Sequence, residues 1–128
     1  MQVLFDTHAL LWFLSDNRML PRKIRSRLLE PETRLFFSPV SILEIAIKHS
    51  LKPAAMPCAP DEVREAAEAS GLVELPFASG HSVAVGSLPW IHRDPFDRML
   101  LAQARVERMT LLTHDDAIAA YGDGVLSF

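Results

Sequence analysis

Short apolar runs that alternate with helix-like segments constrain the fold of this chain more than any other feature. Four runs have the length and composition of buried strands, at residues 2–5, 35–37, 72–75 and 110–112, and a terminal strand is expected at 125–126. Strands that alternate with helices form a parallel sheet that helices cover on both faces. The sequence therefore predicts an α/β fold with a central parallel sheet of four or five strands.

The segments between these runs show helical spacing and end at residues that break helices. Pro21 and Pro95 suit first helical turns, and Gly71 suits the end of a helix. Residues 38–40 are expected to form a turn, and residues 53–60 an irregular loop. We expect helices over residues 7–14, 21–29, 41–50, 61–70, 79–86, 95–108 and 116–121.

The bulk properties fit one compact domain over residues 1–128, because the chain is 49% hydrophobic and long enough to bury a core. No apolar stretch approaches the ~20 residues of a membrane helix, and no signal peptide is expected. The single cysteine, Cys58, cannot form an internal disulfide, which indicates a reducing cytoplasm. The net charge of −3 argues against a charge-driven nucleic-acid coat. The net charge does not exclude a nuclease, because a cluster of carboxylates would itself make the net charge more negative.

Acidic residues stand where the expected strands end and the expected helices begin. They are Asp6, Glu44, Asp94, Asp97 and Asp115. Ligands of a parallel sheet collect at the carboxyl ends of its strands, so these side chains can converge. Converging carboxylates repel one another and need a cation, and oxygen-only ligands favour a hard divalent ion. The pattern predicts a magnesium or manganese site, which would act on phosphates by activating water. Zinc is not expected, because the histidines and the cysteine lack its ligand spacing.

Each of these acids also has a purely structural interpretation, because such side chains cap helices. Glu44 could complete a capping box with Ser41, and Asp94 before Pro95 suits an N-cap. The same role is open to Asp6, Asp97, Asp115 and the adjacent Asp116. Capping explains most of them singly, but so many acids at strand ends and helix starts in one short chain favour a shared site.

Polar side chains near the acids could support them. Ser38, Ser41 and Thr113 could hydrogen-bond the carboxylates, or could serve only as turn and cap residues. His92 and His114 are candidates for contact with a phosphate-bearing substrate, although histidines beside a helix cap are more often structural.

Four segments resemble the motifs of PIN-domain proteins, and in particular the VapC-type ribonuclease toxins of prokaryotic toxin–antitoxin pairs. They are residues 5–12, 38–45, 92–104 and 112–115, which occur in the order of the family motifs. The third segment is the most specific, because it contains the core Arg-Asp-Pro-Phe-Asp-Arg. The resemblance spans nearly the whole chain.

The resemblance implies a Mg²⁺- or Mn²⁺-dependent endoribonuclease that hydrolyses RNA and arrests growth. It implies that Asp6, Glu44, Asp97 and Asp115 are the catalytic residues and the metal ligands, with Thr113 as an accompanying hydroxyl. It further implies a homodimer and a cognate antitoxin that covers the site and represses the shared operon. Asp94 resembles a feature of one subgroup, with capping as its alternative role.

Other segments keep two interpretations. Arg93 and Arg98 could bind RNA phosphate or neutralise neighbouring carboxylates. The helix over 7–14 carries more apolar surface than one buried face uses, which suggests a partner interface, although Trp12 could equally belong to the core. The basic run over 18–27 could face RNA or be a solvated helix face.

Two rival functions are considered. A phosphatase with Asp6 as nucleophile would usually carry a second aspartate two residues on, where this chain has His8. An inactive interaction module would use the acids only as helix caps, and the intact set of four acids argues against it.

Overall fold

The computed structural model describes all of residues 1–128, which form an α/β domain around one five-stranded sheet. The sheet has the order β3-β2-β1-β4-β5, and every neighbouring pair of strands is parallel. The strands are β1 (Gln2–Phe5), β2 (Arg34–Phe37), β3 (Val73–Glu74), β4 (Thr110–Thr113) and β5 (Val125–Ser127). The predicted α/β class and parallel sheet are confirmed, with the terminal strand as its fifth member.

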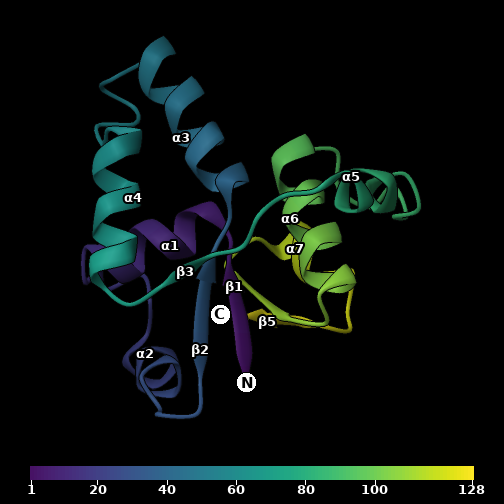
Figure 1. The fold of residues 1–128 in the computed structure, drawn as a ribbon, viewed down its shortest axis with the longest axis horizontal. Helices are drawn as coiled ribbons and strands as arrows, with labels where there is room; N and C mark the ends of the chain where they lie inside the picture. Colours follow the sequence, from purple (N-terminus) through teal and green to yellow (C-terminus); the bar gives the residue numbers. More distant parts are fainter.

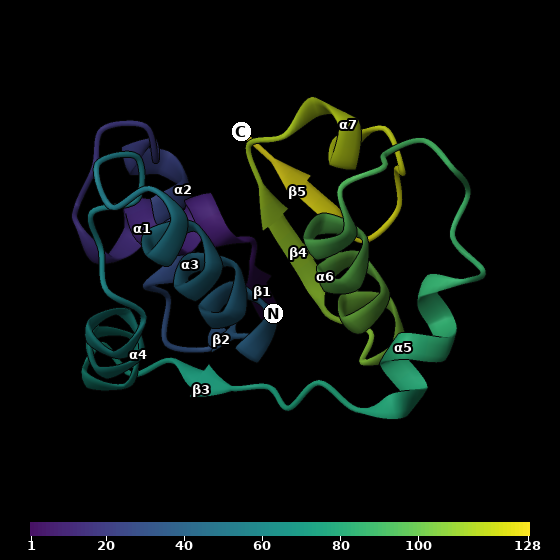
Figure 2. The ribbon, with the colours of Figure 1, turned by 90° about the horizontal axis from the view of Figure 1, so that it is seen from above.

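Seven helices surround the sheet on both faces, as the alternation predicts (Figures 1 and 2). They are α1 (Thr7–Leu14), α2 (Arg22–Leu28), α3 (Pro39–Leu51), α4 (Pro60–Ala69), α5 (Ser79–Val85), α6 (Pro95–Val106) and α7 (Asp116–Ala119). None of these helices combines the length and apolar character that would let it cross a membrane.

Alternate residues of the central strands point into two separate cores, as the two-residue period of a strand requires. Val3 and Phe5 of β1 pack in a cluster with residues of α1, α2 and α4. Leu4, between them, packs in a second cluster with residues of α6 and α7. The central strand is therefore buried on both faces, which explains why residues 3–5 are an unbroken apolar run.

The helix after β2 begins two residues before the predicted start at residue 41. Ser38 is its N-cap and accepts a hydrogen bond from the Val40 backbone N–H at 3.0 Å, and Pro39 occupies the first helical position. Residues 39 and 40 are therefore helical rather than part of a turn. This favourable cap and the preset backbone of proline explain the earlier start.

The carboxyl ends of the neighbouring strands β2, β1 and β4 meet at one edge of the sheet, at the top in Figure 1. β1 passes directly through Asp6 into α1, and the Asp6 backbone N–H donates to the Leu112 carbonyl of β4 at 3.0 Å. β2 leads through Ser38 into α3, and β4 leads into α7. Three helix N-termini are thereby brought to this edge, where anionic groups are stabilised.

The apolar side chains of α1 are buried or half-buried in the domain, and none of them is among the exposed large apolar residues. Trp12 is half-buried and contacts the rings of His114 and Phe128 in edge-on geometry. The exposed large apolar side chains include a stripe on α3 instead, at Leu43, Ile47 and Leu51.

Candidate metal centre

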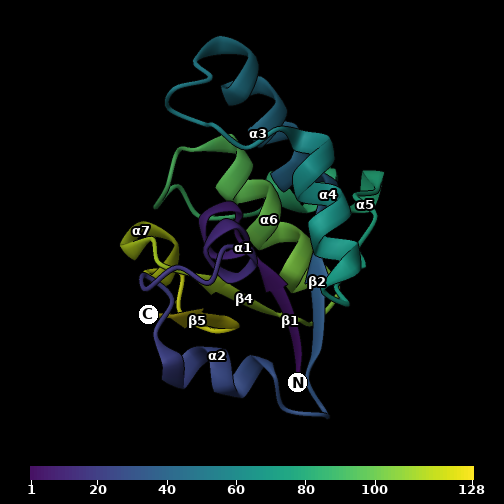
Figure 3. The ribbon, with the colours of Figure 1, turned by 90° about the vertical axis from the view of Figure 1, so that its left-hand side faces the viewer.

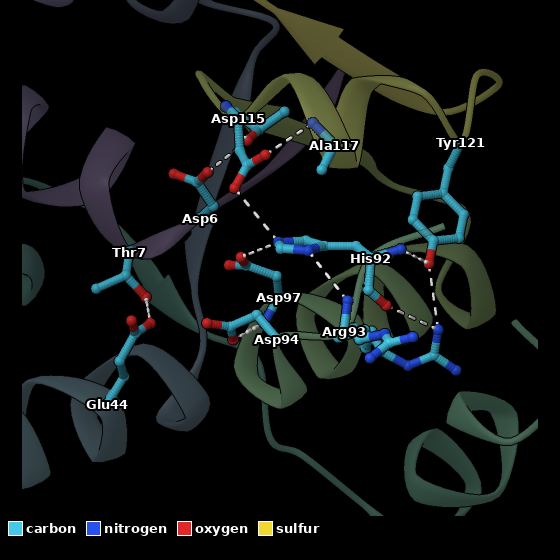
Figure 4. Close-up of polar contacts among 12 residues, drawn as sticks. Asp6, Thr7, Glu44, His92, Arg93, Asp94, Asp97, Asp115, Ala117 and Tyr121 are labelled. Atoms are coloured by element: carbon cyan, nitrogen blue, oxygen red, sulfur yellow. Dashed lines mark hydrogen bonds and ion pairs between the residues drawn. The ribbon is translucent and has the colours of Figure 1, made fainter. Parts of the chain in front are cut away.

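The four acids singled out in the sequence line one pocket at the carboxyl edge of the sheet. Asp6, Glu44, Asp97 and Asp115 border a cavity of about 310 Å³, together with Asp94. Figure 4 shows these carboxylates gathered around one space, although they come from distant parts of the chain. The geometry thus places the four acids that the resemblance implies in one pocket, and Asp94, the fifth acid of the sequence pattern, lies there as well.

Asp6 is held at the floor of this pocket by hydrogen bonds to both carboxylate oxygens. Its Oδ1 accepts from the Ala9 backbone N–H at 2.8 Å, so it caps α1, and its Oδ2 accepts from the Thr113 hydroxyl at 2.5 Å. The side chain is almost fully buried. Burial raises the pKa of the Asp6 carboxyl, and the hydrogen bonds from Thr113 and Ala9 offset part of that rise. A nearby cation would relieve the cost of this buried charge.

Asp94 and Asp97 lie one helical turn apart at the start of α6. Asp94 is the N-cap, and its Oδ1 accepts from the Asp97 backbone N–H at 3.1 Å. The Asp97 carboxylate turns into the pocket, where burial and then the neighbouring charge of Asp94 raise its pKa to about 7. A hydrogen bond from His92 lowers that pKa in part, at 2.7 Å between Nε2 and Oδ2. The single hydrogen bond from His92 therefore leaves much of the Asp97 charge uncompensated.

Asp115 reaches the same imidazole from the opposite side of the pocket. Its Oδ1 caps α7 by accepting from the Ala117 N–H at 2.8 Å, and its Oδ2 lies 3.3 Å from His92 Nε2. The adjacent Asp116 is exposed and does not line the pocket. The structure thus places Asp115, and not Asp116, at the site.

His92 bridges two carboxylates, which the sequence did not reveal. Its Nδ1 accepts a hydrogen bond from the Arg93 backbone N–H at 3.1 Å, so the neutral ring carries its proton on Nε2. That N–H is directed between Asp97 and Asp115 (Figure 4). The imidazole N–H therefore lies between the two carboxylates as a hydrogen-bond donor.

Glu44 is fixed by two partners and takes no part in the capping box that its spacing suggested. Its Oε1 accepts from the Thr7 hydroxyl at 2.6 Å, and its Oε2 pairs with the ammonium group of Lys48. The Ser41 hydroxyl lies 3.1 Å from that of Thr7, whereas Ser38 caps α3 and contacts no carboxylate. Lys48 lines the pocket and was missed, although its position four residues after Glu44 on one helix was a readable signal.

Arg98 is a structural residue and not an RNA contact. The side chain is buried, and its guanidinium donates to the carbonyls of Val85, Leu88, Pro89 and His92 and to the Tyr121 hydroxyl at 2.9–3.3 Å. It also lies 3.8 Å from the ring centroid of Trp90. These contacts tie the segment before α6 to the domain, and that segment carries His92.

The donor set fits a hard divalent cation such as Mg²⁺ or Mn²⁺. Oxygen atoms of carboxylates dominate the pocket, and two of these acids, Asp6 and Asp97, have raised pKa values. Ligand atoms of Asp97, Asp115 and His92 all lie within 4.8 Å of one another, whereas Asp6 and Glu44 are outside this group. His92 acts here as a hydrogen-bond donor through Nε2, which leaves the two carboxylates as the ligands of this group. Crowded, buried carboxylates with few counter-charges are the arrangement that a divalent ion stabilises.

Comparison with known proteins identifies a family and similar folds. A family model described as the PIN domain matches residues 3–124. The fold is similar to VapBC2 from Rickettsia felis bound to a DNA fragment from its promoter (TM-score 0.70, 14% identity, 100% of this chain and 99% of that chain). It is also similar to VapBC-1 from nontypeable Haemophilus influenzae (TM-score 0.67, 18% identity, 100% and 97%). A third similar structure is a toxin–antitoxin complex from Klebsiella pneumoniae (TM-score 0.65, 19% identity, 98% and 96%). No curated protein matches the sequence.

Replacement of Arg98 by alanine should destabilise the fold by about 3–5 kcal/mol, because several buried carbonyls lose a charged donor at once. Urea unfolding monitored by circular dichroism measures this change. Arg105 on the same helix is the matched control, since it is exposed and donates one hydrogen bond, to the Tyr121 carbonyl at 3.1 Å. Arg105→Ala should cost less than about 1 kcal/mol. Equal losses in the two variants would contradict the structural role of Arg98.

Stability without divalent ions should fall as the pH rises from about 4 to about 7. The raised pKa of Asp97, about 7 against its ordinary 3.8, means that the folded chain keeps a proton that the unfolded chain releases in this range. The loss attributable to Asp97 is up to about 4 kcal/mol. Denaturant unfolding in a chelator at pH 5 and pH 8 measures it. Asp97→Asn should flatten this dependence, whereas Asp116→Asn should leave it intact; an unchanged slope in Asp97→Asn would refute the assignment.

Proposed function

Because the chain belongs to the PIN-domain family, we propose that it is a Mg²⁺- or Mn²⁺-dependent endoribonuclease that acts as the toxin of a toxin–antitoxin pair. The observation that carries this proposal is the convergence of Asp6, Glu44, Asp97 and Asp115 in one pocket. Family membership and this pocket support hydrolysis of a phosphodiester bond. The choice of RNA follows the resemblance to VapC-type toxins.

In this proposal Asp6, Asp97 and Asp115 hold the divalent ion. Asp6 and Asp115 are oriented by their helix caps through Oδ1, while Oδ2 accepts from the Thr113 hydroxyl in Asp6 and lies 3.3 Å from His92 Nε2 in Asp115. When bound, the cation supplies positive charge that makes a nearby water more acidic and neutralises charge on the phosphate. Thr113 fixes the orientation of Asp6 through its hydroxyl, as a supporting residue does for a ligand.

Glu44 has a different part, because its two oxygens are already bonded to Thr7 and Lys48. We assign Glu44 the role of orienting the attacking water, and the aspartates hold most of the ion's charge. Its hydrogen bond raises the pKa of the Lys48 ammonium, which therefore stays charged beside the pocket. His92 keeps Asp97 and Asp115 apart at a defined separation.

The partners follow from the structural neighbours as proposals for this chain. The similar structure from Klebsiella pneumoniae is a toxin–antitoxin complex, and that of VapBC2 from Rickettsia felis contains a DNA fragment. We propose a cognate antitoxin that binds this chain, covers the pocket and represses the shared operon, and a homodimer of the chain itself. The exposed apolar side chains of Leu43 and Ile47 on α3 provide surface for such protein contacts.

The rival functions find less support in the site. The Asp6 carboxylate is almost fully buried and accepts hydrogen bonds on both oxygens, which leaves it a poor nucleophile for a phosphatase. Helix capping by Asp6, Asp94 and Asp115 is real, as an inactive module would require. Capping alone does not explain why Asp97, which caps no helix, points into the same pocket.

Asp6→Asn and Asp97→Asn should each lower RNA cleavage at least about a hundredfold while the far-ultraviolet circular dichroism stays unchanged. The assay is Mn²⁺-dependent cleavage of single-stranded RNA, with Asp116→Asn as the matched control because that acid lies outside the pocket. Isothermal titration with Mn²⁺ should show binding to the wild type and to Asp116→Asn, and a strong loss of binding in the other two variants.

Two results would refute the proposal. A wild-type chain that neither binds Mn²⁺ nor cleaves RNA would favour the inactive module. Full metal-dependent activity in Asp6→Asn would remove Asp6 from the site.

A further inference from the structure

A second hollow lies beside the acidic pocket and shares part of its wall. It has a volume of about 300 Å³ and is lined by His8, Lys48, Leu51, Lys52, Ala55 and Met56. His8 and Lys48 also line the acidic pocket. An extended polymer that leaves the pocket on this side therefore passes directly into the hollow, which lies at the end of α3.

The charge of the lining changes sign between the two cavities. The acidic pocket is lined by five carboxylates, whereas no acidic residue lines the hollow. Its cations are Lys48 and Lys52, one turn apart on the end of α3. Lys48 is paired with Glu44, but Lys52 is exposed and forms no ion pair. The ammonium of Lys52 is thus free to meet an anion that comes from outside.

The floor of the hollow is apolar. Leu51 is 74% exposed and Met56 is buried beneath the surface, with Ala55 beside them. Apolar side chains next to a free ammonium group match a nucleotide, which pairs a negative phosphate with an uncharged base. A protein partner has a better surface on the same helix, at Leu43 and Ile47, where the side chains are apolar and exposed.

We propose that this hollow is a subsite for the nucleotide adjoining the scissile phosphate, and this inference rests on the proposed ribonuclease function. The phosphate of that nucleotide is bound by Lys52, and its base lies over Leu51 and Met56. A polyanion held at an acid-lined pocket is repelled by every carboxylate that the metal does not neutralise. Cations immediately outside the pocket offset that repulsion and direct the strand along α3.

Lys52→Ala tests the subsite, because Lys52 lies outside the acidic pocket and its recorded hydrogen bonds are made by its backbone. The KM for single-stranded RNA should rise roughly threefold to tenfold while kcat is unchanged. The salt dependence of RNA binding should lose about 0.7 from its logarithmic slope, the contribution of one phosphate contact. Binding is followed by fluorescence anisotropy of labelled RNA in a chelator, which prevents cleavage.

Lys23→Ala is the matched control, since it removes the same charge from α2, at the opposite end of the molecule from α3 (Figure 3). It should leave KM and the salt slope at their wild-type values. If the wild type cleaves RNA but Lys52→Ala behaves as Lys23→Ala does, the subsite is refuted and the ribonuclease function stands. Loss of antitoxin binding in Lys52→Ala with unchanged RNA kinetics would refute it as well, by assigning the hollow to a protein. Absence of cleavage in the wild type would instead refute the ribonuclease function.

Discussion

Mutual repulsion of carboxylates at one edge of the sheet is the constraint on which the rest of this structure depends. Asp6, Asp97 and Asp115 come together because strand ends and helix starts meet there, and burial makes the charges of Asp6 and Asp97 costly. The fold counters that cost locally with helix N-termini, with the hydroxyl of Thr113 and with the imidazole of His92. The remaining uncompensated charge is what suits the pocket to a divalent cation.

Helix capping and membership of the acidic site are compatible roles in this domain. Asp6 and Asp115 each use one carboxylate oxygen to cap a helix, while the other meets a side chain at the pocket. Asp94 caps α6 and raises the pKa of Asp97 by its charge. Capping fixes the orientation of these side chains, so the local preference that seemed to compete with a shared site in fact helps to build it.

The two sides of the pocket carry different cationic side chains. On the α6 side, Arg98 is buried under the segment that carries His92, and it holds that segment through backbone carbonyls. On the α3 side, Lys48 faces the pocket, and Lys52 continues the positive charge into the neighbouring hollow. One cationic side chain thus supports the segment that carries His92, whereas the two lysines line the pocket and the hollow.

The sequence by itself determined the α/β class, the parallel sheet and nearly every element, because the periods of apolar residues and the signals of proline and glycine are local. It also identified the acids that line the pocket. Only the tertiary structure decided that Asp115 rather than Asp116 enters the pocket, that Arg98 is buried, and that Glu44 pairs with Thr7 and Lys48. The physical reason is that burial and hydrogen-bond partners depend on segments distant in the chain, as in the bond between Asp6 and Thr113, and local patterns carry no record of them.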